Sequence, residues 1–263
     1  MTERRGVGVS GELGREAVAD LAALAEDCGY DNFWINVNRR DQDPVGLVAA
    51  AAGRTKFEIG VGVFPLDRYT PDEVAEDVAA AGLSDPRFIF CISSGRATTG
   101  ILDLDRRGIE ALRKASPKSR VGIGGYGPKV LALSGAIADV VNINWMTPER
   151  VGWATEQIAA GAREAGRPMP ALYLYHRVAQ GPNAADIIAD ELTRYRSNPV
   201  QVKHQATMGD PHFIGIAAMT REEIAPQLAP YLGICIPVIK PKPADPTDVA
   251  DWKRLVRFFS PKG

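Results

Sequence analysis

The sequence predicts an α/β protein, a parallel (β/α)8 (TIM) barrel. Short apolar runs alternate with amphipathic helical patterns along all 263 residues of the chain. Strict alternation of strands and helices is typical of parallel βαβ units, and eight such units in about 250 residues match a barrel of this kind. A doubly wound open sheet is the alternative, but it usually needs fewer strands. We therefore expect a single barrel domain over residues 1–263.

Each predicted strand is a short apolar run that is followed by a segment with helical periodicity. The strands are expected at 6–10, 31–37, 57–63, 87–93, 120–124, 138–144, 171–178 and 234–240. The helices are expected at 14–28, 44–53, 71–83, 104–115, 127–136 and 148–166, within 183–232, and at 246–259. Gly29 ends the first helix as a left-handed cap, and Pro71 with two acidic residues after it begins the third.

The strand expected at 57–63 carries glycines at positions 60 and 62. Glycine weakens a buried strand and often marks a bulge or a close approach of the backbone to a ligand. The alternative is an ordinary barrel strand that needs small residues for packing. We expect a bulge at Val61 and Gly62.

Composition and charge argue against several classes of function. A formal net charge of −1 gives no electrostatic reason to bind nucleic acid or a membrane surface. No stretch reaches the ~18–20 apolar residues of a membrane span, and no apolar run follows Arg4 and Arg5 as in a signal peptide. The cysteines and histidines lack the spacing of metal ligands. We expect a cytoplasmic protein that acts on a small molecule without a metal.

The barrel prediction places the chemistry at the carboxyl ends of the strands, where barrel enzymes carry their active sites. One such end is the glycine cluster at 124–127. A flexible backbone at a helix N-terminus can direct N–H groups at a phosphate, and the helix dipole adds to the attraction. A tight turn needed only for helix packing is the alternative. His176, near another strand end, is more consistent with a structural histidine.

Several segments resemble the bacterial luciferase-like superfamily, which contains flavin monooxygenases and reductases that use the deazaflavin coenzyme F420. The similar segments lie in the same order as in that family, at 30–36, 56–71, 87–95, 124–139 and 219–224. In that family the third strand carries a bulge, often with a non-prolyl cis peptide, behind the flavin-type ring. The matching positions here are Val61 and Gly62.

The resemblance implies a bound F420, with FMN as the alternative, and a homodimer. It also implies that the phosphate of the cofactor lies at Gly125 to Gly127. A composition rich in Ala, Gly, Asp and Arg is typical of high-GC genomes, where F420 is common, and this favours F420. The expected cofactor-binding residues are Asn36, Val61, Gly62, Ser93, Ser94, Gly125, Tyr126, Gly127, Asn144 and Trp145.

Three positions depart from the family pattern and are the candidate catalytic residues. Asn38 and Arg39 stand where many reductases of the family carry an Asp–His pair, and Arg96 stands where some carry a glutamate. Arginine is no acid or base near neutral pH and asparagine exchanges no proton, so these changes remove acid–base chemistry. A plain turn residue is the alternative for Asn38. The segment from Gly95 to Arg120 also has room for little more than one helix, where the family carries a longer cover.

Three functions remain open from the sequence. The first is an F420- or FMN-dependent oxidoreductase that transfers a hydride between the ring and a small organic substrate. The second is a cofactor-binding protein without turnover, which the three replaced positions and the short cover suggest. The third is an unrelated barrel enzyme that acts on a phosphorylated metabolite, for which Lys240 is the one good candidate for a Schiff-base lysine.

Overall fold

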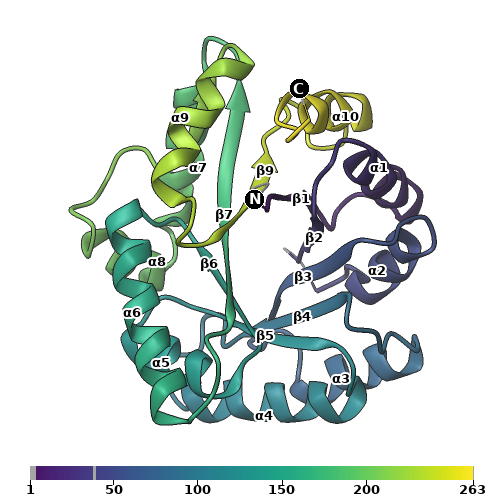
Figure 1. Cartoon of the computed structure of the whole chain (residues 1–263), viewed down its shortest axis with the longest axis vertical. Helices are drawn as coiled ribbons and strands as arrows, with labels where there is room; N and C mark the ends of the chain where they lie inside the picture. The colour runs from purple at the N-terminus through teal and green to yellow at the C-terminus, as the bar shows by residue number, and fades with distance from the viewer. Residues whose placement is uncertain (1–3, 38–39, 263) are drawn as a thin grey trace.

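The structure is a computed structural model, and it describes residues 4–37 and 40–262. The described chain forms a closed parallel barrel with helices arranged around it (Figure 1). Strands β1 to β7 follow one another in chain order, and β9 lies between β7 and β1. The predicted (β/α)8 barrel is confirmed.

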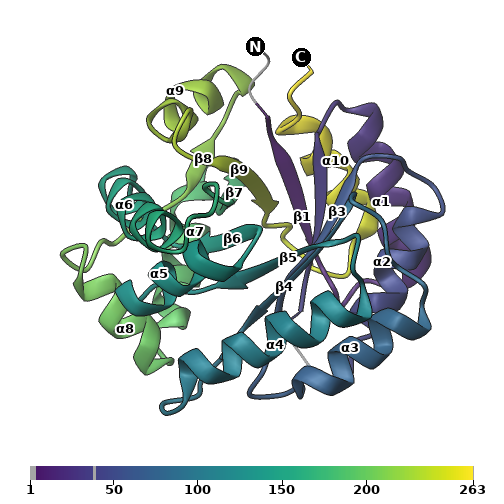
Figure 2. The ribbon, with the colours of Figure 1, turned by 60° about the horizontal axis from the view of Figure 1, so that its bottom comes forward.

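The bounds of the elements agree closely with the expected ranges. The barrel strands are β1 (Gly6–Ser10), β2 (Asn32–Asn36), β3 (Glu58–Pro65), β4 (Phe88–Ser93), β5 (Arg120–Gly124), β6 (Val140–Asn144), β7 (Ala171–Gln180) and β9 (Ile236–Pro241). The flanking helices are α1 (Arg15–Asp27), α2 (Pro44–Ala52), α3 (Pro71–Ala80), α4 (Ile101–Ala115), α5 (Pro128–Ile137), α6 (Pro148–Glu164) and α10 (Val249–Phe258). In Figure 2, α3 and α4 lie side by side along one flank of the barrel.

The region expected to be helical between β7 and β9 is more varied than its sequence predicts. It contains α7 (Ala184–Tyr195), α8 (Pro199–Ala206) and α9 (Ile224–Leu228), with short 3-10 turns on either side of α9. It also contains β8 (Ile216–Ala218), which pairs in parallel with the last residues of β7. Three residues are too few to show an alternating pattern, so this strand could not be predicted from the sequence.

Alternate residues of each strand point into the barrel, where a compact set of side chains fills its lower part. These side chains are Trp34, Ile89, Cys91, Val140, Tyr173, Tyr175 and Val238. The two glycines of β3 make room for this packing. A Cβ atom on Gly60 would lie 2.6 Å from the Trp34 ring, and one on Gly62 would lie 2.4 Å from the Tyr175 hydroxyl. Packing therefore explains Gly60 in full and Gly62 in part.

The irregularity of β3 falls one residue later than predicted. Gly62 still has a partner on β4, Cys91, and the register then shifts so that Phe64 pairs with Ile92. Val63 is the extra residue, and the Gly62–Val63 peptide bond is cis. Because a bulge interrupts the strict alternation of side chains, Gly62 and Val63 both face the same side, at the mouth of the barrel.

The described segment between β4 and β5 contains one helix, α4, as its length predicts. Within residues 4–37 and 40–262, no helix has both the length and the apolar character needed to cross a membrane.

Candidate functional site

A pocket of about 340 Å³ opens at the carboxyl ends of the strands. Its volume lies at the lower end of the range of small-molecule sites. Most of the predicted cofactor-binding residues line it, namely Asn36, Gly62, Ser93, Ser94, Gly125, Tyr126, Gly127 and Asn144. They come from the ends of β2, β3, β4, β5 and β6 and from the turn before α5. The barrel therefore brings together residues that are more than one hundred positions apart in the chain.

The remaining predicted site residues do not line this pocket. Val61 and Trp145 are fully buried, and Trp145 packs against Tyr195 with ring centroids 5.2 Å apart. Arg96 is exposed on the turn after β4. Asn38 and Arg39 lie outside the described residues.

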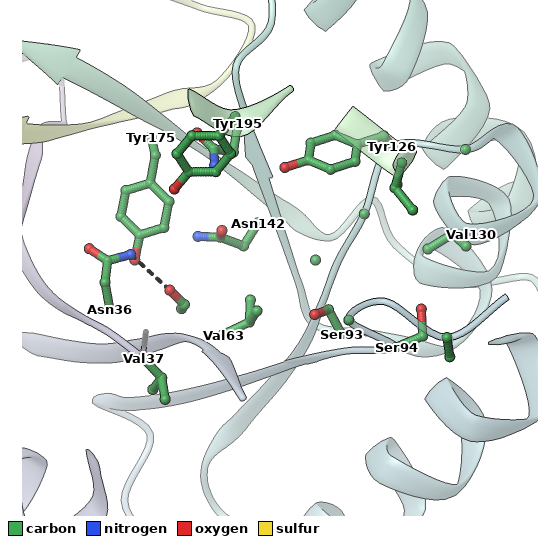
Figure 3. Close-up of a pocket in the computed structure, with 18 of the residues that line it drawn as sticks. Asn36, Val37, Val63, Ser93, Ser94, Tyr126, Val130, Asn142, Tyr175 and Tyr195 are labelled. Carbon is green, nitrogen blue, oxygen red and sulfur yellow. Dashed lines mark hydrogen bonds between the residues drawn. The ribbon is translucent and has the colours of Figure 1, made fainter. Parts of the chain in front are cut away.

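One end of the pocket is formed by three polar side chains that approach one another from three strands. Figure 3 shows Asn36, Asn142 and Tyr175 together, with the Asn36 amide donating to the carbonyl oxygen of Gly62 at 2.9 Å. Within the described residues, Asn36 Oδ1, Asn142 Nδ2 and the Tyr175 hydroxyl make no hydrogen bond of ordinary geometry. Each of these side chains is at most 6% exposed.

These three atoms are costly to leave without partners. A buried polar atom without a hydrogen bond costs about 1–3 kcal/mol. Burial also raises the pKa of Tyr175 well above its usual value, and the neighbouring Asn36 and Asn142 side chains offset this only in part, so its hydroxyl keeps its proton and can donate. A ligand with a polar edge would satisfy one acceptor, one amide donor and one hydroxyl at this end of the pocket.

The other end of the pocket lies at the N-terminus of α5. Gly127 is the N-cap of this helix and supplies no side-chain cap, and Pro128 is the first helical residue. The first helical hydrogen bond runs from the Leu131 N–H to the Gly127 oxygen. The N–H groups of Lys129 and Val130 therefore have no partner within the helix, and Val130 lines the pocket.

Helix α8 forms part of the pocket wall and is held there by an aromatic contact. His204 stacks on Tyr126 with ring centroids 4.1 Å apart, and its Nε2 bonds the Trp145 carbonyl oxygen at 2.8 Å. Burial lowers the pKa of His204 to about 4, so it is neutral near pH 7. His176 lies outside the pocket lining, packs against Tyr231 and has a pKa lowered by burial to about 3. Neither histidine is among the described residues that line the pocket.

Several pocket residues were missed from the sequence. They include Val63, Asn142, Tyr175 and Arg177, whereas Lys240, which the sequence offered only as a Schiff-base candidate, also lines the pocket. Three of them follow from the two-residue period of a strand: Tyr175 and Arg177 share the inward face of β7, and Asn142 lies two residues before Asn144 on β6. Counting inward from each predicted strand end would have found them.

A buried carboxyl group lies close to Ser94, one of the two serines that line the pocket. Asp105 of α4 is 0% exposed, and neither of its oxygens has a hydrogen bond of ordinary geometry within the described residues. Burial raises its pKa to about 7, and the nearby Ser94 backbone N–H offsets this only in part. No group of three or more His, Cys, Asp or Glu side chains in the described chain could hold a metal ion.

Comparison with known proteins shows which family the chain resembles. Residues 1–102 match the family model of luciferase-like monooxygenases. The predicted family resemblance is confirmed. A 5,10-methylenetetrahydromethanopterin reductase from Methanolobus tindarius is 27% identical over 192 residues. That match covers 57% of this chain and 56% of the relative, so it spans little more than half the length of the curated protein.

Solved structures share the fold over nearly the whole chain. An F420-dependent secondary alcohol dehydrogenase in complex with an F420–acetone adduct has a TM-score of 0.73 and 17% identity, covering 98% of this chain and 97% of its own. The coenzyme F420-dependent tetrahydromethanopterin reductase from Methanopyrus kandleri has a TM-score of 0.66 and 16% identity, with 98% of both chains covered. The FMN-bound oxygenating component of 3,6-diketocamphane monooxygenase from Pseudomonas putida has a TM-score of 0.69 and 14% identity, covering 99% and 97%. At these identities the likeness establishes the fold.

A matched pair of substitutions tests whether the unpartnered Tyr175 hydroxyl is kept for a ligand. Tyr175→Phe should leave the free energy of unfolding unchanged or raise it by up to ~1 kcal/mol, because it removes an unsatisfied buried group. It should weaken binding of F420 or FMN about five- to tenfold. Tyr173→Phe, the control, should instead lower stability by ~1 kcal/mol, because that hydroxyl donates to Glu58 at 3.1 Å, and should leave affinity unchanged. Urea unfolding and fluorescence titration measure both; a Tyr175→Phe protein that is destabilised but binds normally contradicts this assignment.

The raised pKa of Asp105 predicts a pH-dependent stability. The folded protein holds this proton up to about pH 7, whereas the unfolded chain releases it near the ordinary pKa of 3.8. The protonated Asp105 therefore contributes to the free energy of unfolding below about pH 4. This contribution, as much as ~4 kcal/mol, is lost as the pH rises to about 7. Asp105→Asn should remove this pH dependence and be more stable than the wild type at pH 8. Urea unfolding between pH 4 and pH 8 measures it, and parallel curves for the two proteins would rule it out.

Proposed function

We propose that the protein is an oxidoreductase that binds F420, or alternatively FMN, in this pocket and transfers a hydride between the ring and a small organic substrate. The observation that carries the proposal is the polarity of the pocket. It has unsatisfied polar side chains at one end and an uncapped helix N-terminus at the other. A flat ring with a polar edge and a phosphate tail suits this arrangement.

Each end of the pocket has a distinct task in the proposed complex. The backbone N–H groups at the start of α5 hold the phosphate, with the positive end of the helix dipole behind them. Gly62 and Val63 form a wall without polar side chains for the face of the ring. Asn36, Asn142 and Tyr175 fix its polar edge. The cofactor, when bound, supplies the hydride chemistry, and the chain supplies its binding and orientation.

F420 is favoured over FMN on two grounds. Two of the structural neighbours described above carry F420 in their descriptions, and one carries FMN. The composition of the chain points in the same direction. The lining described here contains neither a carboxylate nor a histidine, so acid–base chemistry falls to tyrosine, lysine or the residues outside the described ranges.

Two glycine substitutions with matched backbone geometry test the proposal. Gly127 has φ −78° and ψ 149°, and Gly14, the N-cap of α1, has φ −68° and ψ 163°. Neither has a neighbour within 4 Å of an added Cβ, so both should accept leucine and fold. Gly127→Leu should weaken binding of F420 or FMN more than about tenfold by crowding the phosphate, while Gly14→Leu leaves it unchanged.

The measurement is quenching of intrinsic fluorescence by oxidised F420 and, separately, by FMN. Wild-type protein should bind one of them with a micromolar or tighter Kd. If the folded protein binds neither at about 100 μM, the oxidoreductase assignment is lost. If it binds one of them but passes no hydride to any carbonyl, imine or enone, the protein is a cofactor-binding protein without turnover.

A further inference from the structure

The wall of the pocket formed by β7 and β9 carries two basic side chains. Arg177 of β7 and Lys240 of β9 both line the pocket, and they are partners in the β7–β9 register. The lining described here includes no carboxylate. The nearest buried carboxylate, Glu191 of α7, lies behind this wall and outside the lining.

Each nitrogen of the Arg177 guanidinium donates a hydrogen bond to a protein partner. Its Nε donates to Glu191 at 3.1 Å, and its two terminal nitrogens donate to Asn144 at 2.7 Å and to the Tyr195 hydroxyl at 2.9 Å. The guanidinium also packs on the Trp145 ring, 4.7 Å from the centroid. Arg177 is therefore a fixed part of the wall, and its charge is balanced by Glu191.

Glu191 is in turn shared with a second cation, which leaves Lys240 alone. Lys242 forms an ion pair with the other oxygen of Glu191 at 2.8 Å. Although burial acts to raise the pKa of Glu191, Arg177 and Lys242 hold it at about 2. Lys240 is 7% exposed and makes neither a hydrogen bond nor an ion pair with any residue of the described chain.

An isolated buried amine is unfavourable in its charged form. Burial lowers the pKa of Lys240 well below its usual value, and the neighbouring Arg177 and Lys242 act in the same direction. Glu191 and Glu12, the carboxylates that face it from α7 and from the loop after β1, offset this only in part. An anion placed beside the amine would restore the ammonium form.

We propose that Lys240 is a substrate-recognition residue, whose ammonium group binds a carboxylate carried by the organic substrate. This inference rests on the proposed function, because the protein has an organic substrate only if it is the proposed oxidoreductase. Lys240 is distant in topology from the proposed phosphate site, because β6 and β7 lie between β5 and β9. The pocket then has two anion-binding ends, one for the cofactor and one for the substrate. Arg177 supports the second end by keeping Glu191 away from Lys240.

A pair of probes that differ only in charge tests the proposal without a cofactor. Binding of 3-phenylpropionate and of its neutral amide to the whole protein can be followed by NMR. The wild type should prefer the carboxylate about tenfold or more. Lys240→Met should lose that preference, and Lys253→Met, which removes a lysine that pairs with Asp20 outside the pocket lining, should keep it. Because Lys240→Met removes a buried amine that has no partner in the described chain, this variant should also be at least as stable as the wild type.

Proton uptake provides a second readout that a merely structural lysine would not give. Because burial disfavours the ammonium form of the free amine and a bound carboxylate favours it, carboxylate binding should be accompanied by proton uptake, and affinity should fall as the pH rises. Calorimetry in two buffers of different ionisation enthalpy measures this uptake, which Lys240→Met should abolish.

Two results would overturn the proposal. They are equal binding of the two probes by the wild type and a carboxylate preference that survives Lys240→Met. If the surviving preference is then lost in Gly127→Leu, the anion binds at the glycine turn. Failure of the proposed function looks different, because F420 and FMN would then not bind while the preference for the carboxylate probe remained.

Discussion

Closure of the barrel is the constraint on which the site depends. Strand β9 pairs with β7 on one side and with β1 on the other, where Gly6 lies opposite Val238 and Val7 opposite Ile239. This pairing joins the last strand of the chain to the first. Because all strands are parallel, closure brings every carboxyl end to one mouth, and Lys240 faces the same pocket as Asn36 and Asn142.

The inward-facing residues of the strands form two layers, a lower one that fills the barrel and an upper one that lines the pocket. Along β7, Tyr173 packs in the lower layer, Tyr175 spans the boundary, and Arg177 belongs to the pocket wall. The lower layer is aromatic and apolar, so it supports the upper layer without contributing polar groups. The upper layer can then hold unsatisfied amides and an unpaired lysine that would be too costly in a fully closed core.

The fold was predictable because its signals are local and repeat along the chain. The strand bulge was predicted from Gly60 and Gly62, but it falls at Val63. Gly60 is explained by its contact with Trp34, a residue on another strand that the pattern of β3 does not contain. The short strand β8 was missed because it depends on pairing with the extended end of β7.

Site residues were predictable where they follow directly from the end of a strand. They were less predictable where side-chain packing decides whether a residue reaches the pocket. Eight predicted residues line the pocket, such as Ser93 and Gly127, because they follow directly from the strand ends. Trp145 also lies at a strand end, but its ring is buried against Arg177 and Tyr195. The unpaired state of Lys240 depends on Lys242 and Arg177 sharing Glu191, an arrangement of three separate segments that sequence patterns do not show.

A crystal structure of the protein with oxidised F420 would test the proposed site most directly. We expect the ring to lie against Gly62 and Val63 with its polar edge at Asn36, Asn142 and Tyr175. We also expect the phosphate at the turn from Gly125 to Gly127 and the Lys240 amine free of the cofactor. A phosphate bound at Lys240, or a ring bound outside this pocket, would contradict this expectation.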